Sequence, residues 1–183
     1  MTRDHWMLLM GAAAALVLVA VIAAIFAFSG IYDVAADSPH AALTKMLIAT
    51  ARERSIESRL SGVKVPPLED AHMIADGAAD YDAMCTACHL APGMAENEMR
   101  PGMNPKPPVL WRFKHGDPRE QFWVIKHGIK MTGMPAWGVT HSDEEIWNMV
   151  AFLQKLPSLS PAQYHTIVAS GGDHHDHDHM DMH

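Results

Sequence analysis

Cysteine is scarce in this chain: its 183 residues include only Cys85 and Cys88. Two residues separate them, so a disulfide between them would close a very short loop and constrain the unfolded chain little. A structural zinc site needs four ligands, and no second cysteine pair exists to complete one. The pair therefore indicates a chemistry other than a structural cross-link.

Basic residues are too few for a typical nucleic-acid-binding protein. The chain has 14 lysines and arginines against 21 aspartates and glutamates, for a net charge of −7, whereas such proteins usually carry a basic stripe. We therefore expect no nucleic-acid partner. Part of the acidity lies near the C-terminus, so the net charge describes the tail more than the rest of the chain.

Charged side chains are absent from Trp6 to Phe28, where nearly every residue is aliphatic, alanine, methionine or phenylalanine. As a helix this run would span about 34 Å, enough for a bilayer core. A cleaved signal peptide is the alternative, because Ala27 and Ser29 are small residues at plausible cleavage positions, but a signal's apolar region usually has 7–15 residues. We expect residues 1–29 to be a retained transmembrane anchor.

Residues 30–69 are predicted to form a helical stalk and linker below the anchor. Ser38 is a good N-cap with Pro39 at the first helical position, and apolar residues follow at helical spacing. Ser61-Gly62 ends the helix, before a stiff Val65-Pro66-Pro67 linker. The stalk would hold the next domain off the membrane; alternatively, its apolar stripe docks on a partner's membrane subunit.

Residues 70–157 are predicted to form a compact domain. No stretch alternates convincingly with a period of two, so we expect an all-α fold with no substantial sheet. Three main helices are expected, at 70–84, 118–127 and 143–156. The last has a capping box in Ser142 and Glu145, with Pro157 just past its end.

Cys85-Thr86-Ala87-Cys88-His89 fits the C-x-x-C-H pattern of haem c attachment. On one helical turn, two thiols at this spacing can each form a thioether to a haem vinyl group, and the adjacent histidine then lies beneath the iron. A thioredoxin-like redox pair would need a βαβ context, which is absent. A chance match to so short a pattern stays open on these residues alone.

The second axial ligand is expected downstream, in Thr132-Gly133-Met134-Pro135. Gly133 and Pro135 would fix a loop that presents the Met134 thioether to the other haem face. A His/Met axial pair raises the reduction potential. The chain has 14 methionines, so any one of them is more often a packing residue than a ligand. Met131 is the nearest competitor for the axial position.

The segment from residue 70 to residue 156 resembles a class I cytochrome c. In that family the first helix carries a glycine, an aromatic residue four positions on, and the first haem cysteine after another four. Gly77, Tyr81 and Cys85 reproduce this spacing. The resemblance implies a cytochrome c fold, with three main helices around one covalently attached haem c.

The resemblance also implies where the last helix crosses the first, with Met149 and Phe152 packed at Gly77. It implies that the carbonyl of Pro108 accepts the other N–H of His89, which would fix the imidazole. Trp111, Trp123, Trp137 and Trp147 are expected in the haem pocket and core.

With both axial positions of the iron filled, the implied function is outer-sphere electron transfer rather than catalysis. Haem attachment of this type is extracytoplasmic in the family, so we expect the domain to face the periplasm from a single-pass anchor in the bacterial inner membrane. It would serve as a tethered carrier or as the cytochrome subunit of a respiratory oxidoreductase complex, with redox partner proteins that the sequence does not identify. A five-coordinate haem enzyme or sensor is an alternative.

Residues 158–183 are predicted to be a flexible tail rich in histidine, aspartate and methionine. Imidazoles suit copper, zinc and nickel, and thioethers suit Cu(I). A labile site for copper or another divalent metal is therefore predicted there, and a metal-handling protein is a further alternative for the whole chain. The candidate tail ligands are His174, His175, His177, His179 and His183.

Overall fold

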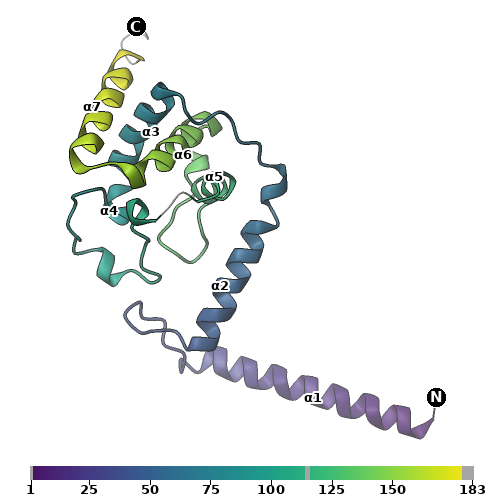
Figure 1. Cartoon of the computed structure of the whole chain (residues 1–183). Coiled ribbons are helices and arrows are strands. Elements are labelled where there is room, and N and C mark those ends of the chain that lie inside the picture. The colour runs from purple at the N-terminus through teal and green to yellow at the C-terminus, as the bar shows by residue number, and fades with distance from the viewer. Residues whose placement is uncertain (1, 114–115, 179–183) are drawn as a thin grey trace. The chain divides into compact units, whose positions relative to one another are not determined.

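The computed structural model describes residues 2–113 and 116–178, with 172–178 described by their backbone alone. Every regular element in these ranges is a helix, so the prediction of an all-α fold is confirmed. The chain forms two compact units, residues 1–39 and 40–183, and each is described by itself (Figure 1).

The first unit is built on α1 (Arg3–Phe28), which contains the uncharged run. None of its residues is buried within the unit, although almost all are apolar. The helix is long and apolar enough to cross a membrane, by a measure that a signal sequence near an N-terminus also meets. Its length and composition fit the predicted anchor.

The second unit begins with α2 (Ala42–Glu57), followed by the 3₁₀ turn η1 (Leu60–Gly62). The predicted N-cap at Ser38 is wrong: the helix starts later, with Ala41 at its N-cap and no side-chain cap. The Ser38 side chain instead hydrogen-bonds Asp33, and its backbone N–H donates to the carbonyl of Ala35 in a turn.

The two ends of α2 differ in their surroundings. Near its C-terminal end, Ile56 is buried, and both α2 and η1 contact α5 (Pro118–His127). Leu43, Met46 and Leu47, in the first two turns, are all more than half exposed. The predicted stalk is therefore partly packed against the domain that it was expected to hold away from the membrane.

The core lies among α3 (Ala71–Met84), α5 and α6 (Asp143–Lys155), which confirms the three predicted helices. Each has a polar N-cap whose side chain accepts backbone N–H bonds: Asp70, Asp117 and Ser142 respectively. The capping box at Ser142 is present in full.

The crossing of α3 and α6 has no room for a side chain on α3. A Cβ built at Gly77 would lie 1.9 Å from the backbone oxygen of Asn148. Around this contact Tyr81, Met149 and Phe152 are at most 1% exposed, and the rings of Tyr81 and Phe152 lie 5.4 Å apart. The helix crossing expected from the class I resemblance is therefore present.

The first part of the C-terminal segment, before the histidine-rich run, corrects the sequence prediction. Residues from 158 on were predicted to be a flexible tail, but Pro161–Asp178 form the helix α7, which lies beside α3 (Figure 1). Tyr164 is 1% exposed, and Ile167 and Val168 pack against the core cluster. These apolar residues, at spacings of three and four, give the first part of the segment a face to bury.

Candidate functional site

The Cys85–His89 motif forms the tight turn that the predicted chemistry requires. Cys85 is the N-cap of the single-turn helix α4 (Thr86–His89), and its carbonyl accepts hydrogen bonds from the backbone N–H groups of Cys88 and His89. The turn ends at Leu90, which has a φ of +59°. The hydroxyl of Tyr81 donates to the carbonyl of Leu90 at 2.7 Å, so α3 holds both ends of the turn.

The surroundings of Cys85 argue against a thiolate redox pair. Cys85 and Cys88 are not joined by a disulfide. Burial, with smaller contributions from Asp80 and Cys88, raises the pKa of the Cys85 thiol to about 12. Redox-active cysteines have a lowered pKa, so the surroundings of Cys85 do not suit the attacking thiolate of a redox pair.

The His89 ring is fixed by a hydrogen bond from one of its nitrogens. Its Nδ1 lies 2.9 Å from the carbonyl oxygen of Pro108 and donates to it, as the class I resemblance implied. This bond leaves Nε2 as the nitrogen with a free lone pair. Burial lowers the pKa of His89, so the imidazole is held in the neutral form that can bind a metal.

Sequence reasoning missed the scaffold behind Pro108, which depends on Asn97 and Arg100. Asn97 donates to the carbonyl of Ala87 in the cysteine turn and accepts the backbone N–H of Arg100. Arg100 is 2% exposed and donates through Nη2 to the carbonyl of Pro107 at 2.7 Å. Together they tie the loop that carries Pro108 to the turn that carries His89.

Two buried donors remain without a hydrogen-bond partner among the described residues, Nε of Arg100 and Nε1 of Trp111. A buried unpaired donor is costly, and each such group calls for an explanation. The carboxylates of haem would accept from donors of this kind. No motif marked Arg100. Its guanidinium pairs with Glu96 at 3.5 Å and donates to Pro107, so only its Nε is left without a partner among the described residues.

The backbone around Met134 is fixed by the loop that precedes it. The carbonyl of Met134 accepts from the N–H of Ile129 at 3.2 Å, and its own N–H donates to the Thr132 hydroxyl at 3.1 Å. Gly128, at the start of the loop, has a φ of +62°, and a Cβ there would lie 2.6 Å from the backbone of Pro135. The loop is thus closed on itself at a residue that must be glycine.

The neighbouring methionines differ sharply in their surroundings. Met131 is 100% exposed, whereas Met134 is partly buried and packs against the core cluster. The sequence did not single out Met103, yet its methyl group lies against Gly133, 2.4 Å from where a Cβ would be. Met103 is therefore a second thioether close to the Met134 loop.

These residues fit a covalently held haem. The unbridged thiols, the neutral imidazole with one nitrogen committed, and the orphaned buried donors are each what a haem c site needs. Cys85 and Cys88 would hold the group, with His89 and Met134 on its iron. When bound, haem c supplies an iron that cycles between ferric and ferrous states.

Comparison with known families gives the same class: a c-type cytochrome domain with covalently bound haem c. The matching family model is described as cytochrome C oxidase, cbb3-type, subunit III, and it matches residues 72–153, just under half of the chain. No curated protein and no solved structure matches the chain significantly. The matched domain is thus similar to a monohaem c-type cytochrome, it follows an N-terminal apolar helix, and the match supports haem-based electron transfer.

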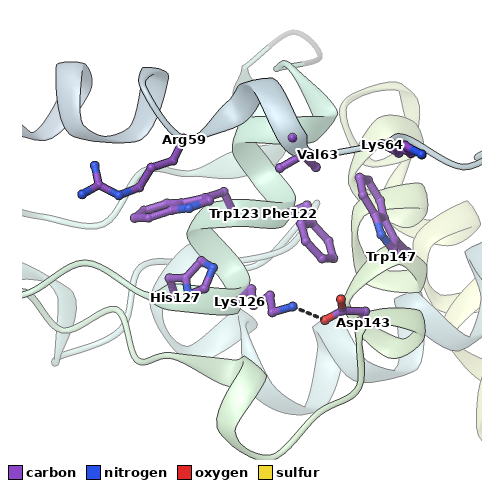
Figure 2. A pocket seen from close by; sticks show the side chains of 10 residues that line it. Arg59, Val63, Lys64, Phe122, Trp123, Lys126, His127, Asp143 and Trp147 are labelled. Atoms are coloured by element: carbon purple, nitrogen blue, oxygen red, sulfur yellow. Dashed lines mark hydrogen bonds and ion pairs between the residues drawn. The ribbon is translucent and has the colours of Figure 1, made fainter.

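A separate pocket of about 350 Å³ lies where the linker after α2 crosses α5 and α6. Figure 2 shows Arg59 next to Trp123 and Val63 next to Phe122. Trp111, Trp137 and Trp147 pack against the core cluster, as expected, and Trp147 also lines this pocket. Trp123, which was expected in the haem pocket or core, lines this pocket instead.

The tail histidines are only partly within the described structure. His179 and His183 lie outside the described residues, and His174, His175 and His177 are described only as backbone of α7. The predicted tail metal site therefore stays a prediction.

Proposed function

We propose that this protein carries single electrons by outer-sphere transfer, through one haem c attached to Cys85 and Cys88 with His89 and Met134 as axial ligands. The contrast between Met134 and Met131 carries the proposal. One thioether is partly buried in a loop closed by hydrogen bonds, and the other is wholly in solvent. With both axial positions filled, the iron has no open site for a substrate, so it exchanges electrons only.

The ligand assignment is tested with three matched methionine variants of the haem-loaded protein. Met134→Ala is expected to abolish the ferric absorption band that reports methionine–iron bonding, and to lower the reduction potential, because the thioether ligand raises it. Met131→Ala, three residues away and fully exposed, is the control and should leave both unchanged. Met103→Ala should also keep the band.

The outcome for Met103 separates two ligand sets. Loss of the band in Met103→Ala, with retention in Met134→Ala, would assign the ligand to Met103 and refute the proposed pair. Absence of the band in the unmodified protein would favour the alternative of a five-coordinate haem enzyme or sensor.

The covalent attachment is tested through the cysteines. Acidified organic solvent should leave the haem on the parent protein, because two thioethers hold it. Cys85→Ser and Cys88→Ser should each leave one thioether, and the double variant should release the haem. Release from the parent would refute attachment through this pair.

We further propose that α1 anchors the protein in a bacterial inner membrane, with the haem domain in the periplasm. The apolar length of α1 and the extracytoplasmic attachment of haem c support this orientation. A reporter fused to the C-terminus that is active only outside the cytoplasm should be active, and a signal from a cytoplasm-only reporter would contradict the topology.

The partner is proposed from the matched family, whose description names an oxidase subunit. Membership of a respiratory oxidoreductase complex is therefore favoured over a tethered carrier that acts alone. Purification in mild detergent should recover this cytochrome with other haem-containing subunits in constant ratio. Recovery of the cytochrome alone from cells with intact respiration would favour the tethered carrier.

A further inference from the structure

Helix α2 has two faces with opposite surroundings. Ala49, Arg52 and Ile56 are partly or fully buried at spacings of three and four, and α2 contacts α5 of the haem domain. Leu43 precedes Arg52 by nine residues, about two and a half turns, so it lies on the far side of the helix. One face therefore ties α2 to the domain, and the other points away from it.

The far face is apolar in the first two turns of the helix. Leu43 is followed on this face by Met46 and Leu47, three and four positions further on. Their exposed fractions are 63%, 56% and 57%. Large apolar side chains that gather on one exposed face mark an interaction surface, which we call the α2 apolar face.

The chain itself limits what can cover the α2 apolar face. Residues 29–41, 13 in number, join the end of α1 to the start of α2. Fully extended they would reach about 45 Å, but turns shorten them: the N–H of Ala35 donates to the Asp33 carboxylate, and the N–H of Ser38 donates to the carbonyl of Ala35. With α1 across a bilayer, as proposed above, the start of α2 stays within reach of the surface of that bilayer.

The charge around the α2 apolar face suits a lipid surface. Residues 40–64 contain five lysines and arginines against two glutamates, a net charge of +3, whereas the whole chain has −7. Anionic lipid headgroups attract basic segments next to a membrane anchor, and an exposed apolar helix face enters the boundary between headgroups and acyl chains. The bilayer is also beside every inserted copy of the chain, so this contact needs no further protein.

We propose that Leu43, Met46 and Leu47 lie in the interfacial layer of the bilayer that α1 crosses. The proposal rests on the proposed anchoring by α1 and adds a second membrane contact, made from the unit that carries the haem domain. Because the opposite face of α2 packs against the domain, this contact holds the domain in one orientation close to the membrane surface instead of on a free tether.

Nitroxide labels on single cysteines test the contact in the full-length, haem-loaded protein, placed in nanodiscs of phosphatidylethanolamine and phosphatidylglycerol. Leu43→Cys and Leu47→Cys are the test positions, because the haem thioethers occupy both native cysteines of the chain. Leu16→Cys, on exposed α1, is the lipid reference, and Thr166→Cys, at an exposed position of α7, is the water reference. Electron paramagnetic resonance measures collisions of each label with oxygen, which concentrates in lipid, and with a water-soluble nickel chelate.

The ratio of oxygen to nickel collisions at residues 43 and 47 is expected to exceed the ratio at residue 166 severalfold and to approach that at residue 16. A ratio equal to that at residue 166 would overturn the lipid contact. Shielding of both labels from both reagents would overturn it as well, and would assign the α2 apolar face to a protein contact. An unchanged haem spectrum shows that each variant is folded.

Two comparisons separate the parts of the argument. A water-like ratio at residue 16 would refute the anchor itself, whereas a lipid-like ratio there with water-like ratios at residues 43 and 47 would refute only the second contact. In nanodiscs of zwitterionic phosphatidylcholine the ratios at residues 43 and 47 are expected to fall, because the basic segment loses its anionic counterpart. Equal ratios in the two kinds of nanodisc would overturn the role of charge.

Discussion

Replacing Gly77 by alanine tests whether the contact of α3 with α6 governs the stability of the haem domain. The added Cβ would lie 1.9 Å from the carbonyl oxygen of Asn148 and 2.7 Å from the backbone nitrogen of Met149. Both neighbours are backbone atoms inside α6, so no side-chain rotation relieves the overlap. Ordinary contact begins at 3.4 Å, so the two helices would have to separate by about 1.5 Å at this point.

The cost follows from what is packed around the crossing. Tyr81, Met149 and Phe152 are at most 1% exposed, so a separation of this size loosens the most tightly packed part of the core. Overpacking of a core costs 1–3 kcal/mol in typical cases. Because backbone must move against backbone, we expect a loss near the upper end, about 3 kcal/mol, and a fall in Tm of about 10 °C or more.

The assay is guanidinium and thermal unfolding of the haem-loaded protein, followed by circular dichroism. Gly62→Ala is the matched control, since a Cβ there would meet nothing within 4 Å, and we expect it to change the stability by less than about 0.5 kcal/mol. A Gly77→Ala protein as stable as Gly62→Ala would show that the crossing tolerates a side chain, and the argument from close helix approach would fail.

Three further predictions test the methionine loop, the C-terminal helix and a helix cap. Gly128→Ala is strained by the positive φ at this position and by the backbone of Pro135. In this variant the methionine–iron band should therefore be lost at a lower temperature than in the parent, and loss at the same temperature would contradict the role of the loop. Tyr164→Phe removes a partly buried hydrogen bond to Asp82 and should lower the free energy of unfolding by about 1.5–3 kcal/mol. Thr166→Ser, at an exposed position of α7, is the control, and equal stability of the two variants would show that this contact of α7 with α3 does not stabilise the domain. The Arg119 guanidinium beside Asp117 holds the pKa of that carboxyl below its usual value of 3.8. The stabilising contribution of the ionised carboxylate is therefore fully present above pH 3.8 and is lost as the pH falls through the lowered pKa. Asp117→Asn should therefore show a smaller loss of stability below pH 3.8 than the parent in acid titrations, and an identical acid limb would refute the linkage.

Local sequence signals predicted the main helices well. α5 begins at Pro118 after Asp117 and ends before Gly128, and α6 begins after Ser142, all at residues with strong terminal preferences. Such signals act within a few residues of the chain, so the sequence displays them directly. The same logic failed at Ser38, because its hydroxyl had another local partner in Asp33.

The haem-binding motif could be predicted from sequence, but the groups that support it could not. Cys85, Cys88 and His89 are adjacent, so their spacing alone indicates the chemistry. Arg100 becomes notable only when the fold buries it beside Pro107 and leaves its Nε without a partner. Contacts between residues far apart in the sequence decide such roles, and no short pattern records them.

The α7 helix was not predicted because the polar composition of residues 173–183 was taken as typical of the whole C-terminal segment. The histidine and aspartate run after Gly172 indicates a solvated tail, and that indication was extended back to residue 158. What makes residues 161–171 fold is the surface of α3, where Ala75 and Ala79 let Gly171 approach the backbone closely.

Small residues on two faces of α3 thus determine which helices can pack against it. Gly77 admits the backbone of α6, and Ala75 and Ala79 admit α7. The first contact is common to the class I resemblance and lies within the matched residues 72–153. The contact with α7 involves a helix that follows the matched residues 72–153. It packs on a different face of α3 from α6. Since α3 ends at the haem cysteines, and Gly171 of α7 lies against Ala75 in its first half, α3 connects the haem turn to the added helix.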